Sequence, residues 1–424
     1  MESNRYLAGV SVQTTVDLCC YHAVIIMALQ LRTVAMPAVR LRARRYHYQR
    51  DAGYPCHSLT ARALCHRFPP LWRNVIISAS RRATPGRFVH MDSEELRAGL
   101  GRFIAEEIGT STKLGSLTES DGHAGLTFLF DIVESSGVTK GFVIKLPPKG
   151  VKRKGNTDVY RQAPLLRALH ADGVPVPRVP WAFDENDWFD LPFIIMERLP
   201  GRVFFVWDPP AVFDRSKSQS NSLWEQCARA LPRIHLFDWR RHLPDWETPE
   251  ALESQIRRWE RIYAQAPEAA WVKGAEACER ALLDTVPDGE PGGLFHGDYQ
   301  PGNVLYHDGS LSGIIDWELS GIGAQLLDLG WMMMSADQSY WTEKWRPIHP
   351  LTPTKIRQIY ESEMGREFDV IPWYQALAGY RIGCIACLNV KLHRKGQRRD
   401  PIWENIALSV PAFFDGARKI AQTL

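Results

Sequence analysis

The chain has 424 residues, a formal net charge of +3 at neutral pH and a hydrophobic content of 45%. These values are ordinary for a globular protein with room for two or three domain-sized units. No run of 18 or more apolar residues occurs, which excludes an ordinary transmembrane helix, and the eight cysteines are too sparse for a disulfide scaffold. We therefore expect a cytoplasmic protein with no membrane partner.

Residues 1–90 differ from the remainder of the chain in charge. They contain thirteen arginines, no lysine and three acids, a net of +10, so residues 91–424 carry −7. Three interpretations are open: a basic targeting or nucleic-acid-binding arm, a disordered extension, or an upstream stretch translated from a misplaced start before Met91. The Lys/Arg clusters with interleaved aromatics that are typical of nucleic-acid binding are missing. We predict no nucleic-acid partner and no folded role for this segment.

From Met91 onward the chain shows the patterns of a folded protein. Asp92 and Ser93 precede a helical pattern with acids in its first turn, which is a helix-start signal. Short apolar runs that predict strands follow at residues 114–117, 126–133 and 141–146.

A glycine-containing loop separates the first two of these strands. It spans residues 118–125 and includes Gly122 and Gly125, whose backbone N–H groups could cover nucleotide phosphates. A plain hairpin loop fits the same residues. Lys145 ends the third strand inside an apolar run, where a lysine needs an anionic partner, and it therefore favours the phosphate-binding interpretation.

The next patterns complete a change from strands to helices. Helical spacing at residues 158–170 contains Pro164, which is expected to bend the helix, and residues 193–198 predict a buried strand. Helical patterns then dominate, among them residues 222–237 and 248–265. A sheet-rich part at 91–200 and a helix-rich part at 201–424 predict an α+β protein with two lobes.

The most informative segment, residues 296–318, reads HGDYQPGNVLYHDGSLSGIIDWE. Asp-Gly between two apolar runs is a strong hairpin signal, and such a hairpin would return Asn303 and Asp316 to the same end. Phosphoryl transfer to a hydroxyl needs a carboxylate near the attacking oxygen, here Asp298, and amide and carboxylate oxygens on magnesium. The alternative is a set of ordinary polar turn residues.

Neighbouring polar residues have less specific interpretations. His296 is expected to be a structural histidine that bonds backbone carbonyls. Glu318 could bind a second metal through water, or be a solvated or helix-capping glutamate. Asp328 is expected to be a buried acid that ties the catalytic loop to a helix. The lone C-x-x-C pair at Cys384 and Cys387 lies in an apolar run and predicts a buried helix.

The 296–318 segment resembles the catalytic core of the aminoglycoside phosphotransferase (APH) and choline kinase-like family. LPRIHLFDW at 231–239, ESQIRRWERIY at 253–263, DLGW at 328–331 and WYQALAGYRI at 373–382 resemble the branch that is often associated with acyl-CoA dehydrogenases. The resemblance extends from about Met91 to the C-terminus.

The resemblance implies a protein-kinase-like fold, with a sheet-rich N-lobe and a mainly helical C-lobe, that uses ATP and Mg²⁺. It implies Asp298 as the catalytic residue and Asn303 and Asp316 as metal ligands. Nucleotide-binding groups would be Lys145, Gly122, Gly125, Gln162 and the hinge backbone at Glu197, Arg198 and Leu199. Gln162 stands where the family usually has a glutamate that pairs with the lysine. Either Lys145 is held less firmly, or a nearby acid such as Asp158 substitutes.

We therefore expect a kinase that moves the γ-phosphate of ATP to a hydroxyl of a small-molecule acceptor. The acceptor would be a hydroxyacyl-CoA-like or antibiotic-like alcohol, with a functional association with acyl-CoA metabolism. A basic run in the C-lobe is either a solvated loop or, if it faces the site, suited to an anionic acceptor; it comprises Lys391, Arg394, Lys395, Arg398 and Arg399. The alternative function is a nucleotide-binding pseudokinase that acts as a regulatory partner, which only Gln162 supports.

Overall fold

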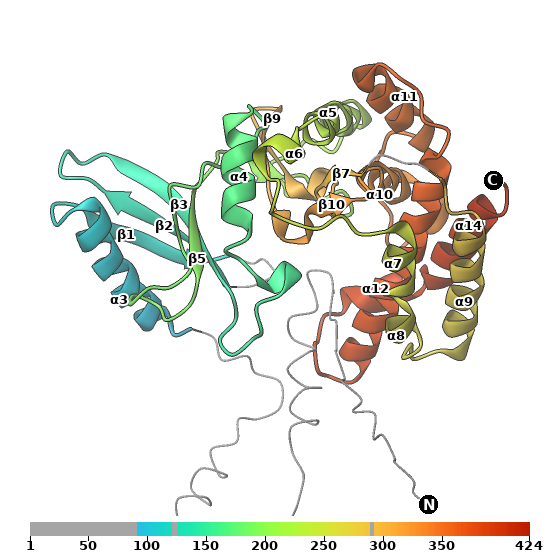
Figure 1. The fold of residues 1–424 in the computed structure, drawn as a ribbon, viewed down its shortest axis with the longest axis horizontal. Helices are drawn as coiled ribbons and strands as arrows, with labels where there is room; N and C mark the ends of the chain where they lie inside the picture. Colours follow the sequence, from blue (N-terminus) through green and yellow to red (C-terminus); the bar gives the residue numbers. More distant parts are fainter. Residues whose placement is uncertain (1–90, 121–125, 289–291) are drawn as a thin grey trace, which may run out of the picture.

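A computed structural model describes residues 91–120, 126–288 and 292–424. Two lobes lie side by side, one built on an antiparallel sheet and the other mainly of helices (Figure 1). This is the α+β arrangement that the sequence predicted. The expectations for Gly122, Gly125 and residues 1–90 fall outside the described residues.

The N-lobe contains a five-stranded antiparallel sheet with the strand order β1-β2-β3-β5-β4. Its strands are β1 (Lys113–Glu119), β2 (Leu126–Val133), β3 (Thr139–Leu146), β4 (Trp181–Phe183) and β5 (Phe193–Glu197). Buried and half-buried residues alternate along β2, as expected of a strand with one face in a core. The predicted strand at 126–133 coincides with β2, and the predicted runs at 114–117 and 141–146 lie inside β1 and β3.

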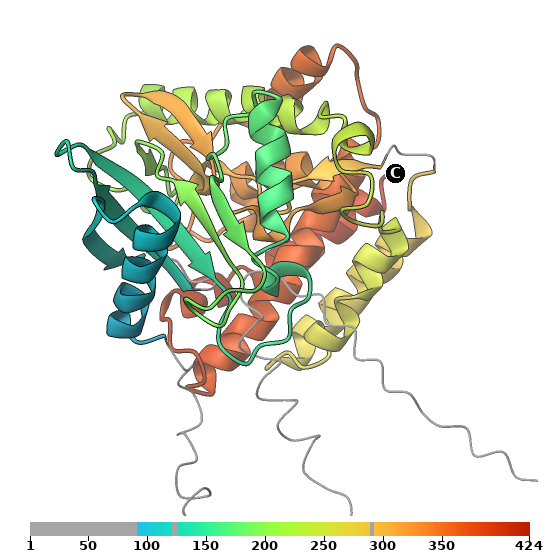
Figure 2. The ribbon, with the colours of Figure 1, turned by 60° about the vertical axis from the view of Figure 1, so that its left-hand side comes forward.

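One face of the sheet is covered by α3 (Ser93–Phe103), which Figure 2 shows lying across the strands. The helix begins at Asp92, whose side chain accepts the Glu94 N–H at 3.2 Å, as the sequence indicated. Phe103 lies at the centre of the core beneath it. Four aromatic rings meet Phe103 edge-on, and they belong to Trp181, Phe183, Trp188 and Phe193. Such contacts add to the free energy gained by burying the rings.

The other face of the sheet shares its core with the C-lobe. Buried side chains of α4 (Gln162–Ala171) and of β5 belong to the same apolar cluster as the helices of the C-lobe. Helix α4 stands between the sheet and those helices (Figures 1 and 2). A backbone bond from the Ile314 N–H to the Pro175 carbonyl, 2.7 Å long, also joins the lobes. Helix α4 is therefore held from both sides.

The C-lobe is organised around one long helix, α12 (Ile371–Arg394), which packs against α9, α10 and α14. The other helices are α5 (Lys217–His235), α6 (Trp239–His242), α7 (Leu252–Arg257), α8 (Glu260–Tyr263), α9 (Ala269–Asp284), α10 (Leu327–Ala336), α11 (Pro353–Met364), α13 (Ile402–Ala407) and α14 (Val410–Ala421). Short strands complete the lobe: β6 (Arg202–Val203), β7 (Gly293–Phe295), β8 (Val304–His307), β9 (Ser310–Ile314) and β10 (Gly321–Gly323).

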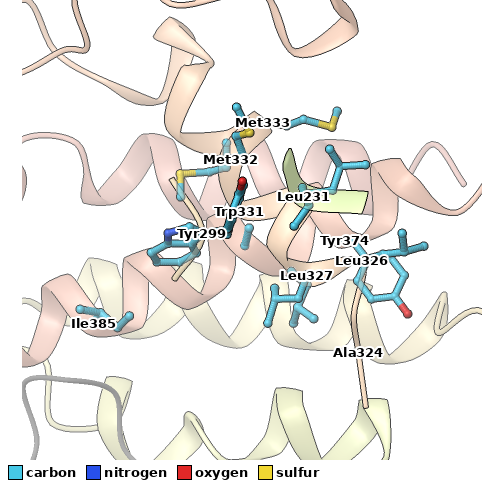
Figure 3. Packing of buried hydrophobic residues seen from close by; sticks show 14 of the residues in the cluster. Leu231, Tyr299, Ala324, Leu326, Leu327, Trp331, Met332, Met333, Tyr374 and Ile385 are labelled. Atoms are coloured by element: carbon cyan, nitrogen blue, oxygen red, sulfur yellow. The ribbon is translucent and has the colours of Figure 1, made fainter. Parts of the chain in front are cut away.

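Helices α10 and α12 cross at very short range. A Cβ atom on Gly330 of α10 would lie 2.3 Å from the Tyr374 carbonyl oxygen of α12, so only glycine fits there. Trp331 and Met332 lie beside this crossing, together with Leu231 of α5 (Figure 3). The whole Trp331–Met334 run belongs to this core, because all four residues are buried.

Two predicted helices differ in their bounds. Helix α4 begins at Gln162 instead of residue 158, so Pro164 falls in the first turn, where proline does not break a helix. The pattern at 248–265 forms two short helices, α7 and α8, and not one. The predicted buried helix around Cys384 and Cys387 is part of α12. No helix in the described part of the chain is long and apolar enough to cross a membrane.

Candidate active site

Two predicted metal ligands lie at the open end of the β8–β9 hairpin. Asp308 and Gly309 form its turn with φ angles of 49° and 75°, the positive values that a tight two-residue hairpin turn requires. Just beyond the paired strands, the Ile315 N–H donates to the Asn303 carbonyl at 3.0 Å. Asn303 and Asp316 therefore lie at the same end of the hairpin, as predicted.

Asp298 lies next to Asn303 in the loop between β7 and β8. The Asn303 Nδ2 donates to the Asp298 carbonyl at 2.8 Å and to the Asp298 carboxylate at 2.9 Å. These bonds fix the orientation of the amide, and its acceptor oxygen is the atom that could bind a metal. Asp316 has a left-handed backbone, with φ 68° and ψ 54°. For a residue other than glycine this conformation is unfavourable and must be held by its surroundings.

The surroundings of Asp298 disfavour its charged form. The side chain is half-buried. Burial is the largest cause that raises the pKa of this carboxyl from 3.8 to about 7, and the negative charge of Asp316 is the second. The positive charge of Arg381 and the Asn303 amide act in the opposite direction. A carboxyl with a pKa near neutrality is suited to accepting a proton and releasing it again.

Lys145 reaches this site from β3. Its Nζ lies 3.4 Å from Asp316 Oδ1 and 4.0 Å from Glu318 Oε2, and its side chain is only 13% exposed. The expectation that Asp158 substitutes for the missing glutamate is wrong, because Asp158 pairs with Arg153 at 3.0 Å. The interpretation of Glu318 as solvated is also wrong. Glu318 is buried and supplies a second carboxylate to Lys145.

Gln162 occupies the first position of α4 and is buried. Its neutral amide cannot balance the Lys145 charge, but the two carboxylates after β9 can. The lysine is therefore held by acids, as a phosphate-binding lysine usually is. These acids follow the hairpin in the sequence and do not lie on the helix.

The donor set at the hairpin fits a magnesium ion that keeps water and phosphate ligands. Asn303 and Asp316 offer one amide oxygen and one carboxylate, the hard oxygen ligands that Mg²⁺ prefers. The described residues contain no cluster of three or more histidines, cysteines, aspartates or glutamates that could enclose a metal. A site with few protein ligands suits Mg²⁺, which is often held largely by substrate phosphates.

The predicted hinge follows β5 and contacts the same hairpin. The Glu197 N–H donates to the Arg178 carbonyl at 2.9 Å and the Arg198 N–H to the Gly141 carbonyl at 3.0 Å, so both are engaged within the N-lobe. The Leu199 side chain lies against Gly313 of β9, where a Cβ atom would be 2.2 Å from it. Among the three amides, that of Leu199 is the one best placed to serve a nucleotide base.

The comparisons with known proteins agree with this geometry. Residues 121–349, just over half of the chain, match the sequence model of the phosphotransferase enzyme family, APH. The chain belongs to this family.

The curated relatives that the chain matches are named as acyl-CoA dehydrogenases or members of that family. The chain is 29% identical over 252 residues to the probable acyl-CoA dehydrogenase IBR3 of Arabidopsis thaliana, covering 55% of this chain and 30% of that protein. It is 24% identical over 197 residues to acyl-CoA dehydrogenase family member 10 of Mus musculus, covering 46% of this chain and 18% of that protein. The chain thus spans less than a third of these relatives' length.

Solved structures show the same fold. A Ralstonia eutropha protein assigned to the aminoglycoside phosphotransferases has a TM-score of 0.62 and 20% identity, covering 80% of this chain and 99% of that one. A thermostable mutant of aminoglycoside phosphotransferase APH(4)-Ia, in complex with AMP-PNP and hygromycin B, has a TM-score of 0.51 and 15% identity, covering 76% and 98%. At these identities the likeness establishes the kinase-like fold.

A buried polar chain supports the catalytic loop of the phosphotransferase from behind. Asp328 of α10 accepts the backbone N–H groups of His296 at 2.6 Å and of Gly297 at 2.7 Å. The His235 ring of α5 lies 3.5 Å from the same carboxylate and 2.7 Å from the Tyr360 hydroxyl of α11. The predicted role of Asp328, tying the loop to a helix, is confirmed. The sequence analysis did not identify His235 or Tyr360 as parts of this support.

His296 has the structural role that the sequence indicated. Its Nε2 bonds the Ile315 carbonyl at 2.8 Å, and its Nδ1 accepts the Asp298 N–H at 3.2 Å. This pattern requires the neutral tautomer with the proton on Nε2. Burial lowers the pKa of His296, which keeps the ring neutral. The ring therefore joins the loop that carries Asp298 to the residue just before Asp316.

A buried arginine is a further site residue that the sequence analysis missed. Arg381 of α12 is 7% exposed, and its positive charge acts on Asp298. Its guanidinium lies over the rings of Trp331, at 5.2 Å, and Trp259, at 5.8 Å. The sequence did contain an indication of this role, namely an arginine inside an apolar helical run. Burying a charge there costs free energy unless the charge is paired or hydrogen-bonded.

Three members of the predicted basic run, Arg394, Lys395 and Arg399, line a depression at the end of α12. Its volume is ≈ 520 Å³, and its remaining walls are His393, Gly396, Pro401 and Glu404. Arg394 is paired with Glu404 at 2.9 Å and with Glu268 at 3.1 Å. The depression is therefore lined by basic side chains, but the charge of Arg394 is already paired with two glutamates of the protein.

Proposed function

We propose that this protein transfers the γ-phosphate of ATP, with Mg²⁺, to the hydroxyl of a small-molecule acceptor. The observation that carries the proposal is the joint placement of Asp298, Asn303 and Asp316 on one loop-and-hairpin unit with Lys145 beside it. Hydroxyl-directed phosphoryl transfer needs a positioned carboxylate, metal ligands and a cation for the phosphates. Asp298, Asn303, Asp316 and Lys145 would supply these groups.

Asp298 would orient the acceptor hydroxyl and take its proton. A loose transition state needs little base strength, so the positioning of the carboxylate by the Asn303 amide matters most. The raised pKa of Asp298 makes its carboxylate a better proton acceptor than an ordinary aspartate. Asp298 is thus proposed as the catalytic residue.

Asn303 and Asp316 would hold magnesium, which would supply positive charge to offset that of the phosphates. Lys145 would bind the α- and β-phosphates, and the Leu199 and Glu197 backbone would meet the base. Gly122 and Gly125 keep their proposed place in the phosphate-covering loop, and Gln162 lies at the start of the adjoining helix. AMP-PNP in the related APH(4)-Ia complex supports an adenine nucleotide.

For the acceptor we propose an anionic alcohol, with hydroxyacyl-CoA-like molecules preferred to antibiotic-like ones. Arg381 places a buried positive charge near Asp298. Polycationic aminoglycosides would be repelled by such a charge. The curated relatives are named as acyl-CoA dehydrogenase family members, which supports a functional association with acyl-CoA metabolism. A cytoplasmic location, with neither membrane nor nucleic-acid partners, completes the proposal.

The deciding experiment measures ADP release by the full chain with ATP and Mg²⁺. The acceptor panel contains hydroxyacyl-CoAs, choline-like alcohols, macrolides and aminoglycosides, and Asp298→Ala is the control. Turnover that depends on one acceptor class and vanishes in the variant would support the proposal and name the class. ATP binding without turnover on any acceptor would count against it and favour a nucleotide-binding partner protein.

Arg381→Met tests the choice of an anionic acceptor. Methionine keeps the apolar packing against the two tryptophans and removes the charge. We expect the KM for an anionic acceptor to rise about tenfold or more, because a charge-assisted contact is lost, while the KM for ATP stays unchanged. Equal acceptor KM values in the variant and the wild type would exclude Arg381 from acceptor binding.

A further inference from the structure

The residue next to Gln162 makes the strongest contacts between α4 and the catalytic apparatus. Arg161 donates to the backbone carbonyls of Glu318 at 3.3 Å and Ser320 at 2.7 Å, and it pairs with Glu247 at 2.8 Å. Its guanidinium lies 4.6 Å from the Trp246 ring centre, and the Trp246 indole donates to the Arg161 carbonyl at 2.8 Å. The Arg161 side chain is 11% exposed, so these contacts are largely shielded from water.

Arg161 hydrogen-bonds to a segment that begins at Asp316, one of the two proposed metal ligands. It starts in the left-handed backbone conformation and continues into a single short turn, Trp317–Leu319. Such a turn leaves backbone carbonyls pointing outward that need donors. The forked guanidinium supplies donors to two of these carbonyls in a fixed geometry that a lysine could not reproduce. The conformation of the segment therefore depends on α4.

The same segment also holds the phosphate-binding lysine. Both acids near Lys145, namely Asp316 at 3.4 Å and Glu318 at 4.0 Å, belong to it. The first residue of α4, Gln162, has no charge to offer. Helix α4 thus acts on Lys145 indirectly: Arg161 positions the segment, and the segment positions the two carboxylates.

We propose that Arg161 is a positioning residue that holds the 316–320 segment in its metal- and phosphate-binding conformation. This role replaces the direct contact between a helix glutamate and the lysine, and it rests on the proposed function for the identity of the site. The effect of Arg161 on metal and phosphate binding passes through Asp316 and Glu318.

The test compares Arg161→Met with Arg167→Met in the full chain. Arg167 lies on the same helix and donates to the Val179 carbonyl at 3.0 Å, which keeps its contact inside the N-lobe. Hydrogen exchange of the amides at residues 317–320, without nucleotide or metal, should be faster only in the Arg161 variant. Unchanged exchange there, or equal acceleration in both variants, would overturn the proposal.

A second readout measures AMP-PNP affinity by calorimetry with and without Mg²⁺. The gain in affinity that Mg²⁺ brings should fall about 10–100-fold in Arg161→Met, as is usual when a residue supporting a metal ligand is removed. Affinity without Mg²⁺ should change much less. An equal loss in both conditions would overturn the metal-site role and indicate general damage to the lobe.

Two further variants keep the proposal testable if Arg161→Met does not fold. Arg161→Lys retains the charge but loses the forked donors, and its amides at residues 317–320 should exchange faster than those of the wild type. Trp246→Phe removes the indole N–H that holds the Arg161 carbonyl and leaves a smaller aromatic ring beside the guanidinium. Failure of the wild type to bind AMP-PNP with Mg²⁺ would refute the proposed function, whereas the exchange result would still decide whether Arg161 orders the segment.

Discussion

Two aspartates on opposite sides of the catalytic loop have opposite surroundings. Asp328, on the supporting side, is fully buried, and each of its carboxylate oxygens accepts a backbone N–H. Asp298, on the working side, is half-buried and faces the negative charge of Asp316. The first carboxylate has both oxygens bonded to backbone N–H groups, whereas the second accepts the Asn303 amide and faces a like charge. A carboxylate whose charge and hydrogen bonds are not fully balanced by the protein can interact with a substrate instead.

The difference predicts opposite effects from the same chemical change. At position 328, an Asp→Asn substitution removes a charge that stabilises the folded state. At position 298, the same substitution removes a charge that destabilises the folded state. At position 298 it also removes the group proposed to act in the reaction. The comparison can therefore be tested with matched variants.

The largest expected effect is on activity. Asp298→Asn should lower kcat by about a thousandfold, because a positioned proton acceptor typically contributes a factor of a hundred to ten thousand. AMP-PNP binding with Mg²⁺ should persist, because Asn303 and Asp316 are unchanged. The measurement is steady-state ADP release with the identified acceptor, together with calorimetric AMP-PNP binding. Near-normal kcat in the variant would remove Asp298 from its proposed role.

Much of this site could be predicted from local sequence. The Asp308-Gly309 pair between two apolar runs predicted a hairpin, and the hairpin determines where Asn303 and Asp316 meet. Such features depend on residues that are close in the sequence. The buried support role of Asp328 was predicted for a similar reason, since it lies in an apolar helical run that follows the motif.

The partners of Lys145 and α4 could not be predicted in this way. Glu318 is 173 residues from Lys145 in the sequence, and its burial depends on how two lobes pack. The start of α4 was misplaced because residues 158–161 have helical spacing, while the Arg153–Asp158 ion pair and a short turn precede the helix. Tertiary contacts therefore determine both the pairing of Glu318 with Lys145 and the residue at which α4 begins.

The supporting side should respond to substitution mainly in stability. Asp328→Asn replaces one acceptor with an N–H₂ donor that faces a buried backbone N–H, which should cost about 2–4 kcal/mol. The melting temperature should fall by several degrees or more. Asp415→Asn is the matched control, because Asp415 is 61% exposed and lies 3.5 Å from Arg418. A fall no larger than that of the control would show that Asp328 is dispensable.

A smaller effect is expected farther along the same polar chain. Tyr360→Phe removes the hydroxyl that bonds His235 at 2.7 Å, leaving a buried ring nitrogen with one partner fewer. The expected cost is about 1 kcal/mol, typical for one buried neutral hydrogen bond. Thermal unfolding monitored by circular dichroism would detect it, and kcat should change little. A loss of kcat without a loss of stability would mean that the chain tunes catalysis directly.

The smallest expected effect is a gain in the thermal stability of Asp298→Asn. It distinguishes Asp298 from Asp328 most directly, because the same substitution at position 328 should lower stability. The pKa of Asp298 is raised to about 7 in the folded protein from 3.8, so the folded state binds the proton more tightly than the unfolded state. The contribution of Asp298 to stability therefore decreases as pH rises from about 4 to about 7 and is constant above that.

Asp298→Asn has no such loss, because its side chain does not titrate. Without metal, its melting temperature should exceed that of the wild type by about 2 °C at pH 8, with a smaller difference at pH 5.5. We expect only this modest gain because the side chain is half-exposed and Arg381 partly offsets the repulsion. Mg²⁺ with AMP-PNP should reduce the difference, since the metal would neutralise the neighbouring Asp316 while the effect of burial remains. An Asp298→Asn variant that is less stable than the wild type at pH 8 would show that Asp298, like Asp328, serves the fold.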